Sequence, residues 1–297
     1  MTAGVNAVKF LPLLLWSALV ASAFGQNTAG HSAQQNPSRV ELRFKLYRNY
    51  LIVVQGNLGW LEGLNFLIDT GANPTAVDQK IAKKLGLKGQ SKQLQLLDQG
   101  ELVEELGLPT LQLGPIRAES HRGIVQDLSP VENNLGVRID AIVGLDILAA
   151  ESFTIDYETK KIIFGDVDPL PFAVPFHTRP PTLTLQLQVG DDAVPLLLDT
   201  GAKDVLLFEC GLAGHGRDLA TLSVKQSSST TGKAFNVREA LLSEVHLVGV
   251  ELGTMRVLVV PGKQTCGWGF AGVLGMSALG FRQIAFDFER KLFTFRK

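Results

Sequence analysis

The sequence Phe66-Leu67-Ile68-Asp69-Thr70-Gly71-Ala72 has a counterpart later in the chain, Leu196-Leu197-Leu198-Asp199-Thr200-Gly201-Ala202. In each copy a run of apolar residues ends in a carboxylate, a hydroxyl and a glycine. An apolar run bounded by a turn signal is typical of a buried strand, and Asp-Thr-Gly directly after it indicates a tight loop at the end of that strand. The sequence therefore predicts, twice, a carboxylate at the edge of a buried core.

Two such carboxylates have a chemical consequence if they face each other. Burial penalises an ionised carboxylate, and two adjacent ones do not readily both ionise, so the pair shares one proton. One member can then act as a general base on a water molecule while the other donates a proton. A single Asp-Thr-Gly is most often only a turn, so the prediction of hydrolytic chemistry depends on whether the rest of the chain also repeats.

The rest of the chain does repeat, with nearly constant spacing. The segment Ala141-Ile142-Val143-Gly144 corresponds to Gly272-Val273-Leu274-Gly275, an offset of 131 residues, and the two aspartates are 130 residues apart. From these glycines each half continues into two strands joined by a charged turn. After the first aspartate, Thr75 is expected to cap a short helix that Gly86 closes.

Length and composition favour a globular protein with two domains. The chain has 297 residues, of which 45% are hydrophobic and 19% charged, enough for about two domains. Its net charge of -1 argues against nucleic acid or an anionic membrane as an electrostatically attracted partner. We predict an N-terminal lobe over 39–168, a proline-rich connector over 169–181 and a C-terminal lobe over 182–297.

The first residues have the features of a secretory signal. Residues 1–23 contain Lys9, an apolar stretch after it and then Ala21-Ser22-Ala23, the small-residue pattern of a signal peptidase site. An uncleaved membrane anchor is the alternative, although the apolar stretch is short for one. Residues 24–38 are polar and small and predict a flexible tether. We therefore expect a secreted or periplasmic protein.

The residues that usually hold metals are poorly arranged for that purpose. The five histidines are scattered without His-Glu-x-x-His spacing, and two cysteines alone do not make the usual zinc sites. We expect neither a metal nor a cofactor. In an oxidising compartment Cys210 and Cys266 could form a disulfide, but their spacing in sequence leaves free thiols equally open.

The two Asp-Thr-Gly-Ala motifs, together with an apolar-apolar-Gly motif 75 or 76 residues after each aspartate, resemble those of the retropepsin-like aspartic proteases. The resemblance covers nearly all of residues 40–297 and takes the form of a fused tandem. It implies an all-β fold with a few short helices, in which two homologous β-barrel lobes hold the active site between them. It also implies a monomer that acts on a peptide or protein substrate.

The resemblance further implies that Asp69 and Asp199 form a catalytic dyad that binds the attacking water. The threonines would hydrogen-bond across the interface, and the glycines after them would let backbone amides approach the carboxylates. The residues to which it gives supporting roles are Thr70, Gly71, Ala72, Thr200, Gly201, Ala202, Gly144 and Gly275. Flap hairpins that cover the substrate would lie near Gly100 and Gly232.

Two roles remain open on the sequence. The first is an aspartic endopeptidase, favoured by the presence of both aspartates. The second is a non-catalytic peptide-binding module with the same fold, favoured by the lack of a tyrosine in either expected flap. Each lobe could also pair with a lobe of another chain, although the connector raises the effective concentration of one lobe for the other.

Overall fold

The computed structural model describes residues 9–10, 39–95, 100–179, 182–214, 219–228, 234–262 and 267–297. Strands make up 56% of the structure and helices 10%, so the predicted mainly β class is confirmed. Apart from residues 9–10, the expected signal peptide and tether lie outside the described residues. Within the described part of the chain, no helix has the length and hydropathy needed to cross a membrane.

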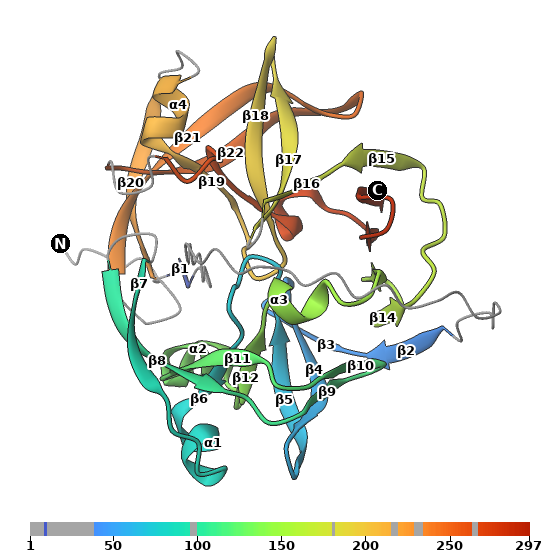
Figure 1. Cartoon of the computed structure of the whole chain (residues 1–297). Helices are drawn as coiled ribbons and strands as arrows, with labels where there is room; N and C mark the ends of the chain where they lie inside the picture. The colour runs from blue at the N-terminus through green and yellow to red at the C-terminus, as the bar shows by residue number, and fades with distance from the viewer. Residues whose placement is uncertain are drawn as a thin grey trace.

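A ten-stranded sheet forms the N-terminal lobe, in blue to green in Figure 1. Its strands follow the order β10-β9-β4-β5-β12-β6-β11-β8-β7, and β3 pairs with β4. Parallel pairing of β12 with β5 places the segment before Gly144 beside the segment before Asp69. The strands are β3 (Lys45–Tyr47), β4 (Leu51–Leu58), β5 (Leu61–Ile68), β6 (Ala76–Asp78), β7 (Gln90–Gln95), β8 (Gly100–Gly107), β9 (Leu111–Leu113), β10 (Ile116–Ala118), β11 (Arg122–Gln126) and β12 (Ala141–Val143).

A nine-stranded sheet forms the C-terminal lobe, in yellow to red in Figure 1 apart from the short blue strand β1. Its order is β1-β20-β21-β22-β19-β23-β18-β17-β16, and β21 also pairs with β17. The strands are β1 (Lys9–Phe10), β16 (His177–Arg179), β17 (Thr182–Val189), β18 (Asp192–Asp199), β19 (Val205–Phe208), β20 (Thr221–Ser228), β21 (Ala234–Leu247), β22 (Val250–Val260) and β23 (Gly272–Gly275).

The expected β-barrel closes in one of the two lobes. In the C-terminal lobe the far end of the 14-residue β21 reaches β17, where His246 and Val245 pair with Gln188 and Val189. The corresponding strand of the N-terminal lobe, β8, has 8 residues and ends at Gly107. After a break at residues 108–110, the next strand β9 makes the pairing with β4 that β21 makes with β17, with Leu111 opposite Leu58. The break between β8 and β9 leaves that sheet open in the pairings among the described residues.

A third sheet of six strands joins the two lobes, with the order β15-β25-β24-β13-β14-β2. Antiparallel β13 and β24 meet in its middle, with Phe153 opposite Phe286 and their rings 4.9 Å apart. Both rings are fully buried, so the two halves share one aromatic core. The strands are β2 (Val40–Arg43), β13 (Phe153–Asp156), β14 (Lys161–Phe164), β15 (Phe172–Pro175), β24 (Gln283–Asp287) and β25 (Leu292–Arg296).

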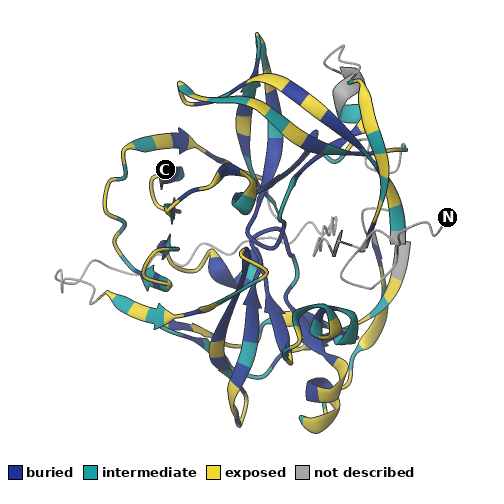
Figure 2. Cartoon of the chain, turned by 180° about the vertical axis from the view of Figure 1, so that it is seen from behind, coloured by how far each residue is buried: buried dark blue, intermediate teal, exposed yellow. Residues whose placement is uncertain are grey.

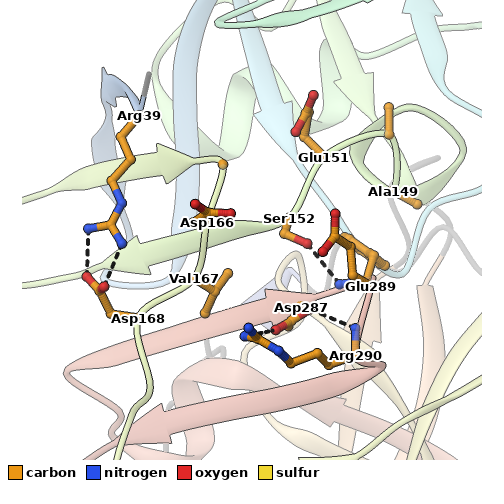
Figure 3. A pocket seen from close by; sticks show the side chains of 13 residues that line it. Arg39, Ala149, Glu151, Ser152, Asp166, Val167, Asp168, Asp287, Glu289 and Arg290 are labelled. Atoms are coloured by element: carbon orange, nitrogen blue, oxygen red, sulfur yellow. Dashed lines mark hydrogen bonds and ion pairs between the residues drawn. The ribbon is translucent and has the colours of Figure 1, made fainter. Parts of the chain in front are cut away.

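Polar contacts around the turns of this sheet add links between segments far apart in sequence (Figure 3). The Ser152 hydroxyl of the first half accepts a 3.0 Å hydrogen bond from the backbone N–H of Phe288 in the second half. Arg39 donates two hydrogen bonds to Asp168, at 2.7 and 2.5 Å. These residues line a hollow of about 590 Å³, whose lining includes no residue of the two Asp-Thr-Gly loops.

The segment expected to be a connector carries the first two strands of the second repeat. In the second repeat β15 pairs with β25, which corresponds to the pairing of β2 with β14 in the first repeat. Likewise β16 pairs with β17, which corresponds to the pairing of β3 with β4. The second repeat therefore begins near Phe172, before the predicted boundary at residue 182. Proline is compatible with β15 because this strand lies at the edge of its sheet.

The helices are short: α1 (Gln79–Lys84), α2 (Ser129–Leu135), α3 (Leu145–Leu148), α4 (Glu209–Gly214) and the 3-10 helix η1 (Met276–Leu279). The prediction that Thr75 caps the first helix is wrong. Asp78 is the cap, since its Oδ1 accepts a 2.8 Å hydrogen bond from the N–H of Lys80. Thr75 is fully buried and precedes β6, which separates it from the helix.

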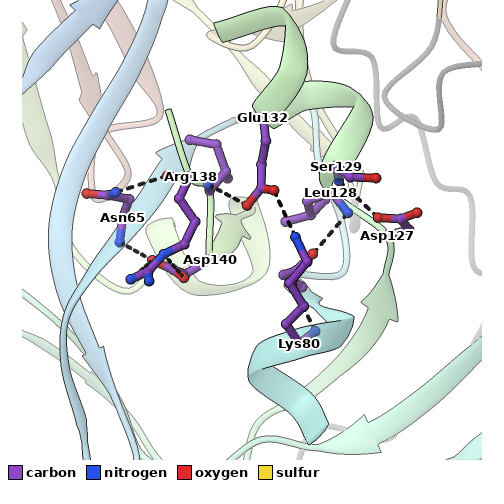
Figure 4. A network of polar contacts seen from close by, with 10 residues as sticks. Asn65, Lys80, Asp127, Leu128, Ser129, Glu132, Arg138 and Asp140 are labelled. Atoms are coloured by element: carbon purple, nitrogen blue, oxygen red, sulfur yellow. Dashed lines mark hydrogen bonds and ion pairs between the residues drawn. The ribbon is translucent and has the colours of Figure 1, made fainter. Parts of the chain in front are cut away.

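A network of polar contacts fixes α2 against the N-terminal sheet (Figure 4). Glu132 of α2 pairs with Lys80 of α1 at 3.0 Å and accepts a hydrogen bond from the N–H of Ile139 at 3.2 Å. The neighbouring Asp140 accepts a 2.8 Å hydrogen bond from the N–H of Asn65 on β5. These bonds tie both helices to the strands that lead to Asp69.

Candidate active site

The two Asp-Thr-Gly loops meet in the middle of the molecule, where the two lobes come together. Figure 2 shows the buried strands of both lobes converging there. Asp69 directly follows β5, and its N–H donates to the carbonyl of Val143 at 3.1 Å. Asp199 is the last residue of β18 and lies opposite Gly275 of β23. Both aspartates have an exposed fraction of 0%, so the folding of the strands alone removes both carboxylates from bulk water.

Each carboxylate is held by the backbone of its own loop. Asp69 Oδ1 accepts hydrogen bonds from the amides of Gly71 and Ala72, at 2.9 and 3.1 Å. Asp199 Oδ1 accepts the same two bonds from its own loop, at 2.7 and 2.9 Å. The second oxygen of each side chain, Oδ2, is buried and has no hydrogen-bond partner among the described residues. One oxygen of each carboxylate is therefore fixed by the loop, and the other has no protein partner among the described residues.

The loop glycines bring each carboxylate against the opposite loop. A Cβ atom added to Gly71 would lie 2.5 Å from Oδ2 of Asp199, and one added to Gly201 would lie 2.4 Å from Oδ2 of Asp69. Heavy atoms do not approach so closely without repulsion. Any side chain at either position would displace the carboxylate of the other lobe.

The two threonines join the loops reciprocally. The N–H of Thr70 donates to Oγ1 of Thr200 at 3.0 Å, and the N–H of Thr200 donates to Oγ1 of Thr70 at 3.1 Å. Each hydroxyl then donates to a carbonyl of the opposite strand: Thr70 to Leu198 at 3.0 Å and Thr200 to Ile68 at 3.1 Å. These four bonds are buried and set the position of one aspartate relative to the other.

The surroundings of the carboxylates favour their protonated forms. Burial raises the pKa of Asp69 to about 6, although the neighbouring Asp199 carboxyl and the amides of its own loop act to lower it. Burial also raises the pKa of Asp199, and the negative charge of Asp69 raises it further. Because the two groups interact strongly, they titrate as a pair and hold one proton between them over an intermediate range of pH.

Two glycines downstream pack directly against these loops. A Cβ atom at Gly144 would lie 2.4 Å from the carbonyl oxygen of Ala72, and one at Gly275 would lie 2.7 Å from that of Ala202. The residue after Gly144, Leu145, donates its N–H to the Ala72 carbonyl at 2.9 Å. The apolar-apolar-Gly segments therefore form the floor beneath both loops.

Two polar residues that support the first loop were not identified from the sequence. Thr75 and Asp146 bond to each other through both the backbone and the hydroxyl of the threonine, at 2.9 and 2.8 Å. Asp146 lies two residues after Gly144, but its partner lies 71 positions away. Because Thr75 was expected to cap a helix, its contact with Asp146 could not be inferred from the sequence.

Tyr50 also approaches the site from the N-terminal lobe. It is buried, and burial raises its pKa above the usual range, with further contributions from the negative charges of Asp204 and Asp199. Both of these aspartates belong to the other lobe. Tyr50 thus lies within electrostatic range of the second Asp-Thr-Gly loop across the junction of the lobes, a placement that sequence reasoning missed because no motif marks it.

Of the two expected flap residues, Gly100 lies in a described hairpin and Gly232 lies outside the described residues. Gly100 begins β8 and pairs with Gln95, the last residue of β7, at the end of the hairpin where the chain passes from β7 to β8. Gly232 lies outside the described residues, between β20 and β21, which pair with each other from Ser228 and Ala234 onward. In Figures 1 and 2 the two hairpins extend toward each other along the same side of the molecule.

Cys210, whose state the sequence left open, is disulfide-bonded. It is the second residue of α4 and packs against an apolar cluster that includes Ala202 and Phe208. Cys266, the other cysteine of the chain, lies outside the described residues.

Comparison with known proteins places this geometry in a family. The model of the aspartyl protease family matches the chain twice, over residues 54–147 and 185–278, and each match contains one Asp-Thr-Gly loop and one of the glycines beneath it. None of the curated proteins matches the chain. Since the two matches together span more than half of the sequence, the chain belongs to the retropepsin-like aspartyl protease family and carries two copies of its domain in tandem.

Proposed function

We propose that this chain is an aspartic endopeptidase in which Asp69 and Asp199 activate a water molecule for attack on a peptide bond. The observation that carries the proposal is the state of the two buried carboxylates at the junction of the lobes. Their Oδ1 atoms are held by loop amides, whereas their Oδ2 atoms are unbonded among the described residues. Membership of the aspartyl protease family supports the same chemistry.

The shared proton defines the roles of the two groups. The ionised carboxylate accepts a proton from the water as the water oxygen bonds to the carbonyl carbon of the substrate. The protonated carboxylate donates its proton to the carbonyl oxygen. When the carbon–nitrogen bond breaks, the carboxyl that took the water proton passes it to the leaving amine. The other carboxylate takes a hydroxyl proton from the tetrahedral intermediate, so the pair is again singly protonated. Each step uses only the two side chains, water and the peptide.

The substrate of this proposal is an extended peptide lying between the two lobes. Extended peptides bind through main-chain hydrogen bonds to neighbouring strands, with pockets for alternate side chains. The β7–β8 and β20–β21 hairpins are the segments we assign to the flaps, because they extend toward each other over the same side of the molecule. Both aspartates belong to one chain, so we propose that the monomer is active.

We also propose that the protein is exported and that its leader ends at Ala23. The leader pattern in residues 1–23 and the disulfide at Cys210 both support export, because disulfides persist mainly in oxidising compartments. Fractionation of expressing cells, with the mass of the mature N-terminus, tests this. Retention of residues 1–23 in a membrane fraction would instead indicate an uncleaved anchor.

The test of the activity is cleavage of a mixed peptide library between pH 3 and 8 by the protein lacking residues 1–23. We expect cleavage at mildly acidic pH, and its loss in both Asp69→Asn and Asp199→Asn variants. Size-exclusion chromatography of the active sample should give a monomer. If the folded wild-type protein binds peptides with the same affinity as Asp69→Asn but cuts none of them, the endopeptidase proposal is wrong and a binding module takes its place.

A further inference from the structure

A chain of hydrogen bonds runs from the surface of the N-terminal lobe to the loop that carries Asp69. At the surface, Nε2 of His121 lies 2.7 Å from Oδ2 of Asp146. The carboxylate of Asp146 also accepts bonds from the N–H of Thr75 at 2.9 Å and from its hydroxyl at 2.8 Å. The same hydroxyl accepts a bond from the N–H of Gly144 at 3.0 Å.

Gly144, the last residue of this hydrogen-bond network, packs tightly against the catalytic loop. Gly144 packs so closely on Ala72 that a Cβ atom would come within 2.4 Å of the Ala72 carbonyl oxygen. The neighbours of Gly144 bond the same loop, since Leu145 donates to Ala72 at 2.9 Å and Val143 accepts from Asp69 at 3.1 Å. A shift of Gly144 therefore becomes a shift of the Asp69 carboxylate.

The second lobe builds the same loop without these polar groups. By the repeat spacing, Val205 takes the place of Thr75 and Ser277 that of Asp146. Val205 is fully buried among apolar residues and has no side-chain group that could hydrogen-bond. Since the fold does not require the network, its presence in one lobe points to a role particular to Asp69.

His121 is placed to hold the outer end of the network. A carboxylate only accepts hydrogen bonds, so His121 must present an N–H at Nε2. Its side chain is 28% exposed and that of Asp146 is 11% exposed. The backbone of His121 is fixed as well, because its carbonyl accepts a 2.7 Å bond from the N–H of Leu108.

We propose that His121 is a positioning residue for Asp69, acting through Asp146, Thr75 and Gly144. The inference rests on the proposed endopeptidase function and adds a residue that touches neither substrate nor water. Loss of the N–H donor frees the carboxylate of Asp146 to rotate away from Thr75, which loosens the contact of Gly144 with the loop. The dyad then spends less time in the productive geometry, while the peptide-binding surfaces are unchanged.

The experiment compares His121→Leu with His121→Gln in the mature protein, using a peptide that the wild type cleaves. We expect His121→Leu to lower kcat about tenfold or more with KM unchanged, because small misplacements of catalytic groups are costly. Glutamine carries an amide N–H at a comparable distance along its side chain, so His121→Gln should keep kcat within about threefold of the wild type. His246→Leu, which removes a partly exposed histidine on β21, is the matched control and should behave as the wild type.

Hydrogen exchange of the segment 69–75 gives a readout that does not depend on activity. We expect faster exchange in His121→Leu, and wild-type exchange in His121→Gln and in the control. Wild-type exchange and kcat in a folded His121→Leu variant overturn the positioning role and leave the endopeptidase function standing. Equal losses in the leucine and glutamine variants also overturn it. A wild-type protein that cuts no peptide refutes the proposed function, and the exchange data then decide the positioning role alone.

Discussion

Thr70 and Thr200 are each the hydrogen-bond acceptor for the backbone N–H of the other, at 3.0 and 3.1 Å. Each hydroxyl thus accepts a hydrogen bond from a buried backbone N–H of the opposite lobe and donates one to a backbone carbonyl of that lobe. The positions of the two aspartates are in this way linked by groups that take no part in the proposed reaction. The arrangement makes the junction of the lobes sensitive to single hydroxyls.

Removal of one hydroxyl should therefore destabilise the whole molecule. Thr70→Val keeps the shape of the side chain but leaves the N–H of Thr200 and the carbonyl of Leu198 without this partner. Buried groups left unpaired cost about 1–3 kcal/mol each, so we expect the free energy of unfolding to fall by about 2–4 kcal/mol in urea titrations. Thr70→Ser, which keeps the hydroxyl, should lose about 1 kcal/mol or less. Equal losses in the two variants would mean that methyl packing, not hydrogen bonding, dominates.

The contact of Gly71 with Asp199 predicts that the addition of a single methyl group at position 71 lowers the activity. In Gly71→Ala the new methyl group would lie 2.5 Å from Oδ2 of Asp199, and the carboxylate must move away from its productive position. We expect kcat to fall by about 100-fold or more, measured on the peptide identified in the library screen. Gly107→Ala is the control, because a Cβ atom there meets no heavy atom within 4 Å. Full activity in Gly71→Ala would show that the loops have more freedom than the structure indicates.

The raised pKa values of the dyad predict how stability depends on pH. An acid whose pKa is higher in the folded state stabilises that state below its unfolded pKa, and this contribution is lost as the pH rises through the folded pKa. For Asp69, with a folded pKa of about 6, the loss falls between about pH 4 and pH 7. Asp69→Asn cannot ionise, so at pH 7 we expect its free energy of unfolding to exceed that of the wild type by about 1–3 kcal/mol.

Urea titrations at pH 4 and pH 7 measure this difference. The gain should disappear at pH 4, where the wild-type carboxyl is protonated. Asp191→Asn, which removes an exposed carboxylate from the turn between β17 and β18, should follow the wild type at both values. A gain of the same size at pH 4 would assign the effect to packing and not to ionisation.

The central sheet predicts that the two lobes unfold together. Phe286 is fully buried and lies 4.9 Å from the ring of Phe153 and 5.4 Å from that of Phe293. Phe286→Ala should lower the free energy of unfolding by about 3–5 kcal/mol and keep a single thermal transition. Phe172→Ala, at the edge strand β15, should cost less because Phe172 is only half-buried. Two separate transitions in the first variant would contradict a shared core.

The features that local sequence could predict are those set by neighbouring residues. The strand before Asp69 follows from a continuous apolar run, and the loop follows from Thr70 and Gly71, so the position of both carboxylates could be inferred. The repeat spacing then indicated that the two loops belong to equivalent lobes. These inferences needed no knowledge of distant contacts.

Other features depended on contacts that no local pattern contains. Pro175 disfavours a strand in general, yet β15 exists because an edge strand can leave one side unpaired. Thr75 has the character of a helix cap, but its hydroxyl is engaged by Asp146, 71 residues away. One barrel closes through the continuous strand β21, whereas the same path in the other lobe is divided between β8 and β9. In each case tertiary contacts decided between local alternatives of similar energy.

Because the two repeats are fused into one chain, the residues around one aspartate can differ from those around the other. In a dimer of identical subunits every substitution appears on both sides of the symmetry axis, so a residue that suits one aspartate must also suit its twin. Here Thr75 can differ from Val205, and Tyr50 can face a loop that has no matching tyrosine opposite. The two carboxylates can therefore be given separate surroundings, and the sequence itself can determine which of them acts as proton donor and which as acceptor in the proposed reaction.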